Sequence, residues 1–226
     1  MLVGAFTASD WATVASLATA GGTLVLAVAT FYSVRGANRA ARSAERALLV
    51  GLRPVLFSSR PHDPEQKIRW GDRHYARVDG GRAVVEQVDD VIYLAMSLRN
   101  IGPGIAVLHG WRTQRAALFG APQAELQANA ARPDPSAFRA QQIDLYVPPG
   151  DVSYWLAAIR DPQDPDRAAI AEVIGNRGAL MIDLLYGDHE GGQRTITRFM
   201  MSQYPERPEW HCGVVRHWNL DRDDPR

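Results

Sequence analysis

The residues best suited to chemistry lie near the end of the sequence. His211 and Cys212 are adjacent, His217 follows on the same stretch, and Asp188-His189 precede them. Imidazole, thiolate and carboxylate groups are the usual ligands of zinc, and a cysteine near a histidine can act as a nucleophile. A hydrolytic enzyme of this kind requires segments 188–189 and 211–217 to meet within hydrogen-bond reach.

The spacing of these residues favours neither kind of site. His211 and Cys212 would point to opposite faces of a strand, and no second CxxC or HxxxH spacing supports a metal. Their surroundings, WHCGVVRHW, have instead the apolar anchors of a C-terminal strand, which are Trp210, Val214 and Trp218. The sequence therefore predicts no catalytic residue, no metal site and no cofactor, and a protein that is not an enzyme.

Two further motifs have structural interpretations. The segment 102–104 (GPG) lacks the glycine spacing of a phosphate-binding loop, and a strand rather than a helix is expected after it. Asp161, Asp164 and Asp166 resemble a set of calcium ligands, but the prolines between them and the lack of a suitable glutamate favour helix capping.

The element that would position everything else is an apolar segment from Trp11 to Val34, which contains no charged residue. As a helix it would be about 36 Å long, enough for a hydrocarbon core of about 30 Å. Trp11 at one end and Phe31-Tyr32 at the other are typical of membrane interfaces. We predict a transmembrane helix. The alternatives are a buried helix and a signal peptide cleaved at residues 27–29 (AVA).

Arginines follow this segment and predict its orientation. Residues 35–60 contain six arginines and one glutamate, whereas residues 1–34 contain one charged residue, Asp10. Because positive charge is retained inside, we expect a single-pass protein of the inner (plasma) membrane with its N-terminus outside and its body cytoplasmic. The remaining residues, 61–226, then have a net charge of −4, which argues against a nucleic-acid partner.

Residues 35–53 should form a basic juxtamembrane helix that ends before Pro54. Arg35, Arg39, Arg42 and Arg46 share one face of it, which either lies on anionic headgroups of the bilayer or belongs to a solvated stalk.

Small residues recur every four positions along the apolar segment. They include Ala12, Ser16 and Ala20, and a face of this kind allows close helix approach in a bilayer. Homo-oligomerisation through this face is one hypothesis. The alternative is that alanine is simply abundant in this chain.

From Pro54 onward the pattern changes to short alternating apolar runs between turns. In residues 90–101, for example, apolar residues occupy every second position, as in a strand with one buried face. Strands are expected at 54–57, 82–88, 90–101, 105–115, 142–147, 153–159, 180–186 and 195–201, with one helix inserted at 164–178. Residues 60–81 are expected to form a mobile loop, and 116–141 a second loop or insertion. The only cysteine excludes an intramolecular disulfide.

The predicted fold is mainly β. An N-terminal tail and transmembrane helix (1–34) and the juxtamembrane helix (35–53) precede an Ig-like antiparallel β-sandwich with one inserted helix (54–218) and a C-terminal tail (219–226).

Four motifs occur in a fixed order along the body: 53–56 (RPVL), 98–104 (LRNIGPG), 147–151 (VPPGD) and 186–195 (YGDHEGGQRT). With them the chain resembles a group of uncharacterised bacterial single-pass membrane proteins, common in actinobacteria, that carry a small cytoplasmic β-sandwich. The motifs are turn and strand-edge signatures, in which Asn100 should bind backbone groups. The resemblance implies a fold and no activity.

Three functions are compatible with these features. The first is a membrane-anchored, non-enzymatic interaction or scaffolding module with an unknown protein partner. The second is a sensor that holds a small ligand between the sandwich and residues 116–141, near Trp111, Tyr154 and Trp155. The third is the hydrolytic enzyme considered above. The membrane topology is the strongest expectation, and it favours the membrane-anchored interaction module.

Overall fold

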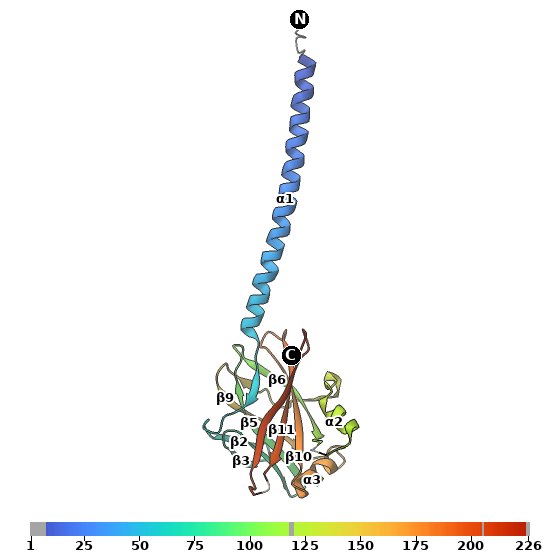
Figure 1. Ribbon diagram of the computed structural model, residues 1–226. Helices are drawn as coiled ribbons and strands as arrows, with labels where there is room; N and C mark the ends of the chain where they lie inside the picture. The colour runs from blue at the N-terminus through green and yellow to red at the C-terminus, as the bar shows by residue number, and fades with distance from the viewer. Residues whose placement is uncertain (1–7, 118–119, 205, 225–226) are drawn as a thin grey trace. The chain divides into compact units, whose positions relative to one another are not determined.

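The computed structural model describes residues 8–117, 120–204 and 206–224. The chain divides into two units, one up to residue 50 and one from Gly51 onward. The first unit is helical and the second, called the β-domain below, consists mainly of antiparallel strands (Figure 1). The prediction of a mainly β protein with a long apolar N-terminal helix is thus confirmed.

The helix α1 (Ala8–Leu52) continues without interruption through Arg35, where the apolar segment ends. Alanine and arginine are both good helix formers, so nothing in the basic part stops it. The span from Trp11 to Leu49 is long and apolar enough to cross a membrane. Polar side chains within it are satisfied locally, since the hydroxyls of Thr19, Thr23 and Thr30 each donate to the carbonyl four residues earlier.

The β-domain contains one large sheet. Its strands are β1 (Leu56–Ser58), β4 (Arg82–Val88), β5 (Val91–Asn100), β6 (Ala106–Arg115), β7 (Arg139–Ala140), β8 (Tyr146–Val147), β9 (Val152–Ile159), β10 (Ala179–Gly187), β11 (Arg194–Gln203) and β12 (Trp210–Asn219). The order is β1-β5-β4-β12-β11-β10-β6-β7, with β9 paired to β5 and β8 to β6. All pairs are antiparallel, and short turns join the successive strands of the pairs β4–β5, β10–β11 and β11–β12.

The sheet curls so that its two halves face each other across the core. The indole rings of Trp111 on β6 and Trp155 on β9 lie 5.6 Å apart, although these strands are not neighbours in the sheet. On the same interior side, the amide of Leu56 donates to the hydroxyl of Tyr186 on β10. The strands β5 and β10, both buried along most of their length, form the centre of the core.

A short hairpin covers the outer face of the half that contains β5 and β9. It consists of β2 (Gln66–Arg69) and β3 (Tyr75–Val78), and its side chains Ile68, Trp70 and Val78 are buried. The prediction of a mobile loop at 60–81 was therefore wrong. Apolar residues alternate with charged ones in this hairpin, because one face packs on the sheet and the other faces solvent. The charged face gives the segment the polar composition of a loop.

The insertion 116–138 contains α2 (Gln123–Ala130) and the short 3₁₀ turn η1 (Pro135–Ala137). It lies over the outer face of the other half of the sheet, where Phe138 packs against the cluster of Leu185, Ile196 and Trp218. Between β9 and β10 lies α3 (Arg167–Gly175), which buries Ile170 and Val173. Figure 1 shows β2 and β3 on one side of the β-domain, and α2 and α3 on the other.

Two other predictions needed correction. The strand expected at 142–147 is reduced to β8, because residues 142–144 are exposed and form no strand. Chain beyond residue 218 is more than a tail, since Asn219 and Asp221 accept hydrogen bonds from the buried guanidinium of Arg53. This arginine connects the first and last segments of the β-domain.

Candidate functional site

A cavity of about 620 Å³ lies where the two end strands of the curled sheet, β9 and β7, face each other. Its size falls within the range of small-molecule sites, roughly 300–1,000 Å³. Four parts of the chain line it: residues 70–72 of the hairpin, Trp111 on β6, residues 139–143, and residues 156–161 together with Asp164. Both segments that were expected to be loops thus contribute walls.

The hairpin wall is held in place by Trp70 and Asp72. The indole of Trp70 donates to the carbonyl of Ala157, and its ring lies 5.2 Å from that of Tyr93. Asp72 accepts hydrogen bonds from the Tyr93 hydroxyl and from Arg160, at 2.7 and 2.8 Å. Partial desolvation opposes ionisation of Asp72, but these donors outweigh it and lower its pKa to about 2. The wall therefore carries a fixed negative charge that is paired with Arg160.

The opposite wall is formed by Trp111 and Arg139. The guanidinium lies over the indole ring, 5.2 Å from its centre, and donates to the carboxylates of Asp164 and Asp166. Its hydrogen bonds to Asp164 raise the pKa of Arg139 and lower that of Asp164, so both stay charged. The pair connects β7 to the segment that leads into α3.

Gln141 bridges the two facing ends of the sheet. Its amide nitrogen donates to the carbonyl of Leu156, and its amide oxygen accepts from the indole of Trp155. On its other side, its backbone amide donates to the carbonyl of His109 on β6. A single side chain therefore spans the gap beside the cavity.

Of the three aromatic residues expected near a ligand in the sensor hypothesis, one lines the cavity and two do not. Trp111 lines the cavity, whereas Trp155 lies in the core and Tyr154 packs on the hairpin. Sequence reasoning missed Trp70 and Arg139. A signal existed for Trp70, because a tryptophan at an alternating position with Ile68 is unusual in a polar loop. None existed for Arg139.

The histidines and the cysteine do not form a common site. Cys212 is buried, with its sulfur 3.5 Å from that of Met96, and burial raises its pKa to about 12. The neighbouring His211 points to the other face of β12 and contacts Arg82. His217 contacts the hydroxyl of Thr197 at 2.7 Å. The expected separation of His211 and Cys212 onto opposite faces is confirmed.

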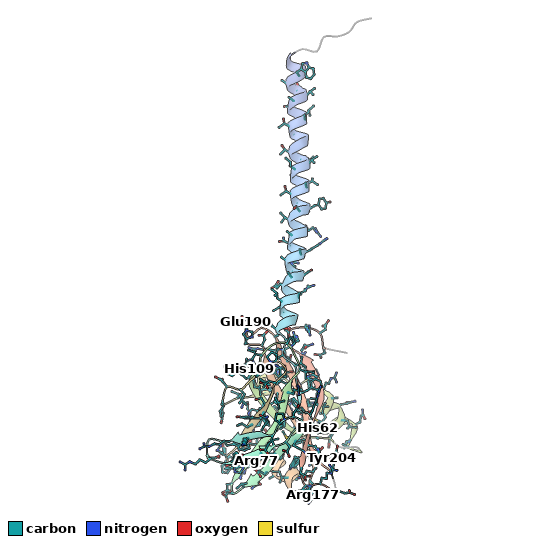
Figure 2. The ribbon with its side chains drawn as sticks, turned by 90° about the vertical axis from the view of Figure 1, so that its left-hand side faces the viewer. His62, Arg77, His109, Arg177, Glu190 and Tyr204 are labelled. Atoms are coloured by element: carbon teal, nitrogen blue, oxygen red, sulfur yellow. The ribbon has the colours of Figure 1, made fainter. Side chains whose placement is uncertain are left out.

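Asp188 and His189 lie in the turn between β10 and β11. The carboxylate of Asp188 accepts the amides of Gly192 and Gln193 and so shapes this turn. His211 packs against Tyr204, with ring centres 4.5 Å apart. Figure 2 shows Tyr204 and Glu190, the residue after His189, towards opposite ends of the β-domain. Segment 188–189 is thus far from His211. Among the described residues, no three His, Cys, Asp or Glu side chains are placed to hold a metal ion.

The residues predicted to act at the membrane all lie on α1. Arg35, Arg39, Arg42 and Arg46 are exposed on one face, and Ala12, Ser16 and Ala20 are exposed along the apolar part. Contact with headgroups and self-association of the helix both stay predictions.

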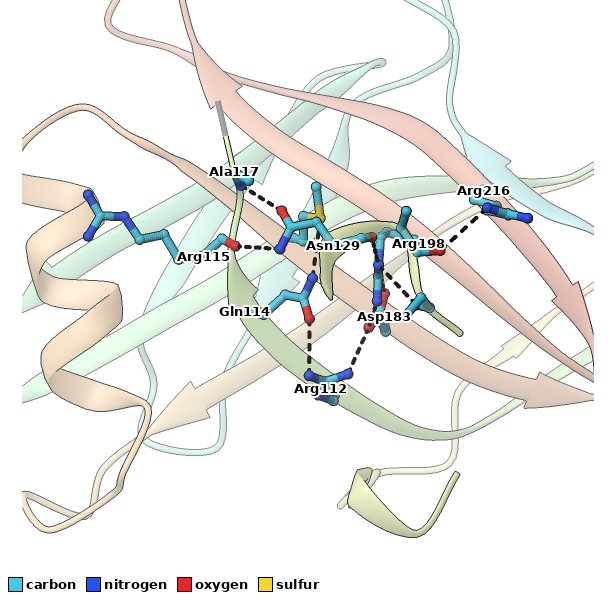
Figure 3. Close-up of polar contacts among 11 residues, drawn as sticks. Arg112, Gln114, Arg115, Ala117, Asn129, Asp183, Arg198 and Arg216 are labelled. Carbon is cyan, nitrogen blue, oxygen red and sulfur yellow. Dashed lines mark hydrogen bonds and ion pairs between the residues drawn. The ribbon is translucent and has the colours of Figure 1, made fainter. Parts of the chain in front are cut away.

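A second polar cluster lies outside the cavity, under the insertion 116–138 (Figure 3). Arg198 and Asp183, both almost fully buried, form two hydrogen bonds of 2.6 and 2.7 Å. Arg198 also donates to the carbonyl of Asn129 at the end of α2, where the helix dipole favours a cation. Asn129 in turn contacts Ala117 through its side chain. Since every group is satisfied within the protein, we assign this cluster to stability.

Comparison with known proteins gives no relative for this chain: no family model, curated protein or solved structure matches it.

Proposed function

We propose that this protein is a membrane-anchored, non-enzymatic interaction module, and that the cavity between β9 and β7 is its binding site. The observation that carries the proposal is this cavity, which has two tryptophans in its walls and charged residues at its edge. Such a combination of apolar surface and a few convergent polar groups is typical of binding sites. The cavity could hold either of two kinds of occupant, a small ligand or a segment of a partner protein. Part of the proposal is that the curled sheet is an Ig-like sandwich.

The proposed anchor is α1, crossing the plasma membrane once with the β-domain in the cytoplasm. At 1.5 Å per residue, the segment beyond Val34 extends about 27 Å past the apolar part. Arg46 then lies about 16 Å beyond Arg35 along the helix axis. The headgroup layer is only about 5–8 Å thick, so an upright helix supports the stalk interpretation, in which only the first arginines reach lipid.

The orientation depends on the arginines after the apolar segment. A green fluorescent protein fused after residue 226 should fluoresce, and alkaline phosphatase fused there should be inactive, because the first needs the cytoplasm and the second the periplasm. Replacing Arg35 and Arg39 by glutamine should weaken the preference for a cytoplasmic C-terminus, so that part of the fused phosphatase becomes active. The control replaces Arg73 and Arg77, which lie in the β-domain, and should change nothing. Active phosphatase on the parent chain would contradict the orientation.

Filling the cavity should abolish binding. Ala140 lines the cavity and is exposed, so Ala140→Trp should occupy ligand space without disturbing the core. The purified full chain in detergent would be mixed with the fraction of a bacterial extract below 1 kDa, which contains metabolites and peptides, and bound masses read by native mass spectrometry. We expect at least tenfold less bound mass for the variant, which corresponds to about 1.4 kcal/mol.

Ala137→Trp is the matched control, since Ala137 is an exposed alanine three residues before Ala140 and does not line the cavity. It should bind like the parent chain. A parent chain that binds nothing, or an Ala140→Trp variant that binds equally well, would exclude the cavity as the binding site.

A further inference from the structure

The outer edge of β9 faces the cavity with its backbone. In an antiparallel pair, alternate residues direct their amide and carbonyl groups to one neighbour and the others direct them away. The amide of Asn100 donates to the carbonyl of Asp151, which fixes the pattern between β5 and β9. It follows that the backbone amide and carbonyl groups of odd-numbered residues of β9 bond to β5. The backbone amide and carbonyl groups of the even-numbered residues point away from β5.

Two other contacts agree with this pattern. The carbonyl of Leu156 accepts from the side chain of Gln141, and the amide of Val152 binds the carboxylate of Asp151. Both groups belong to even-numbered residues. Among the strands that the structure describes, β9 pairs only with β5. The backbone of Ala158, which lines the cavity, is therefore an open strand edge.

The facing end of the sheet has the same property. Directly after β7, the backbone amide of Gln141 donates to the carbonyl of His109, and within β7 the register pairs Ala140 with Gly110. By the same alternation, the backbone of Ala140 points away from β6. Ala140 and Ala158 both line the cavity, and their small side chains leave the backbone accessible. The cavity thus has strand edges on two sides.

We propose that the cavity takes an extended peptide segment, which adds to the sheet as a strand along β9. This inference rests on the proposed function and names the class of its ligand. Strand addition uses backbone hydrogen bonds for affinity and side-chain pockets for selectivity, and Trp70 and Trp111 provide such pockets. From Leu156 to Arg160 the edge is about 14 Å long, which accommodates a peptide segment of about five residues.

Charge selects among such peptides. Three carboxylates line the cavity, those of Asp72, Asp161 and Asp164, against the two guanidinium groups of Arg139 and Arg160. Both arginines are already paired with carboxylates. The remaining charge is negative, so a basic peptide fits better than an acidic one.

The test uses capped heptapeptides of random sequence with arginine, leucine or glutamate fixed at the centre. Each library is passed over the immobilised full chain in detergent, and retained peptides are quantified by mass spectrometry. We expect most retention for the arginine library and least for the glutamate library. Ala158→Pro removes one outward amide without touching the bonds to β5, and proline is tolerated at a strand edge. It should reduce retention about tenfold, as expected for one lost hydrogen bond.

Val152→Pro is the control, because it alters an outward amide of β9 outside the cavity. It should retain peptides within twofold of the parent. As a second measurement that needs no variant, the best peptide is methylated at alternate backbone amides in each of two registers. The peptide methylated at the amides that face β9 should lose affinity about tenfold, and the peptide methylated at the other amides should not.

Peptide retention that is absent, unchanged by Ala158→Pro, or equally affected by both methylation registers would overturn strand addition. Failure of this inference differs from failure of the proposed function. If Ala140→Trp still abolishes binding of a non-peptide mass, the cavity is a binding site for another ligand. If neither experiment detects binding, both proposals are wrong.

Discussion

Replacing Arg198 by methionine is expected to lower the free energy of unfolding by about 3–5 kcal/mol, the usual cost of breaking a buried ion pair. Methionine keeps much of the side-chain volume but removes both hydrogen bonds to Asp183. Among the described residues, the fully buried carboxylate of Asp183 then retains only Arg112 as a charged partner, with its nearest nitrogen 3.6 Å away. A buried charge without close donors is costly because water no longer solvates it.

The same change should loosen the insertion 116–138. Arg198 donates to the carbonyl of Asn129, while every side chain of α2 is at least partly exposed, so that little apolar burial holds this helix. Hydrogen exchange should therefore become faster in α2 than in β5 or β10. The measurements are guanidinium unfolding of the full chain in detergent, followed by tryptophan fluorescence, and hydrogen exchange read by mass spectrometry.

Two further variants separate the ion pair from simple loss of packing. Arg216→Met is the control, because Arg216 lies over the same Trp218 ring and contacts Ala130 but is exposed. It should cost less than about 1 kcal/mol. The double variant Asp183→Leu with Arg198→Met should recover part of the loss, since an apolar pair can replace a buried ion pair. A double variant no better than Arg198→Met would count against this account.

Local patterns predicted those strands whose alternation or turns are strong. The region around β5 shows apolar residues at every second position, and the β10–β11 hairpin has a glycine-rich turn, so both were identified within a few residues. The division of α1 at Arg35 was an inference from charge. Charge determines membrane orientation but does not end a helix, because arginine and alanine continue it readily.

The cavity could not be predicted in this way. Its walls come from residues 70–72, 139–143 and 156–161, which are far apart in the sequence, and they meet only because the sheet curls. Curling depends on the packing of whole strands, for example of Trp111 against Trp155. The hairpin β2–β3 was missed for a related reason: its exposed face is rich in charge, and its buried face becomes evident only against Tyr93 and Leu156.

Asn100 connects three motifs that the sequence presents as separate turns. Its side-chain oxygen accepts the amides of Val55 and Gly102, and its nitrogen donates to the carbonyls of Gly104 and Val147. All four hydrogen-bonding positions of the amide are used. Gly104 is required beside it, because a Cβ atom there would lie 1.7 Å from the carbonyl oxygen of Leu52. The prediction that Asn100 binds backbone groups is confirmed.

Asn100→Ala should therefore lower the free energy of unfolding by about 3–5 kcal/mol. Asn100 is completely buried, so its four backbone partners would lose their hydrogen bonds, and each unsatisfied buried group costs about 1–3 kcal/mol before relaxation. Denaturant unfolding of the full chain would measure the effect. Asn176→Ala, at an exposed position after α3, should cost no more than about 0.5 kcal/mol.

Asn100→Asp distinguishes hydrogen bonding from size. Aspartate has nearly the same shape and can still accept from Val55 and Gly102, but when ionised it cannot donate to Gly104 and Val147. It would also place a buried negative charge against two carbonyl oxygens. If the donated bonds hold the three motifs together, this variant should be at least as unstable as Asn100→Ala. A nearly neutral Asn100→Asp would mean that the side chain acts mainly by filling space.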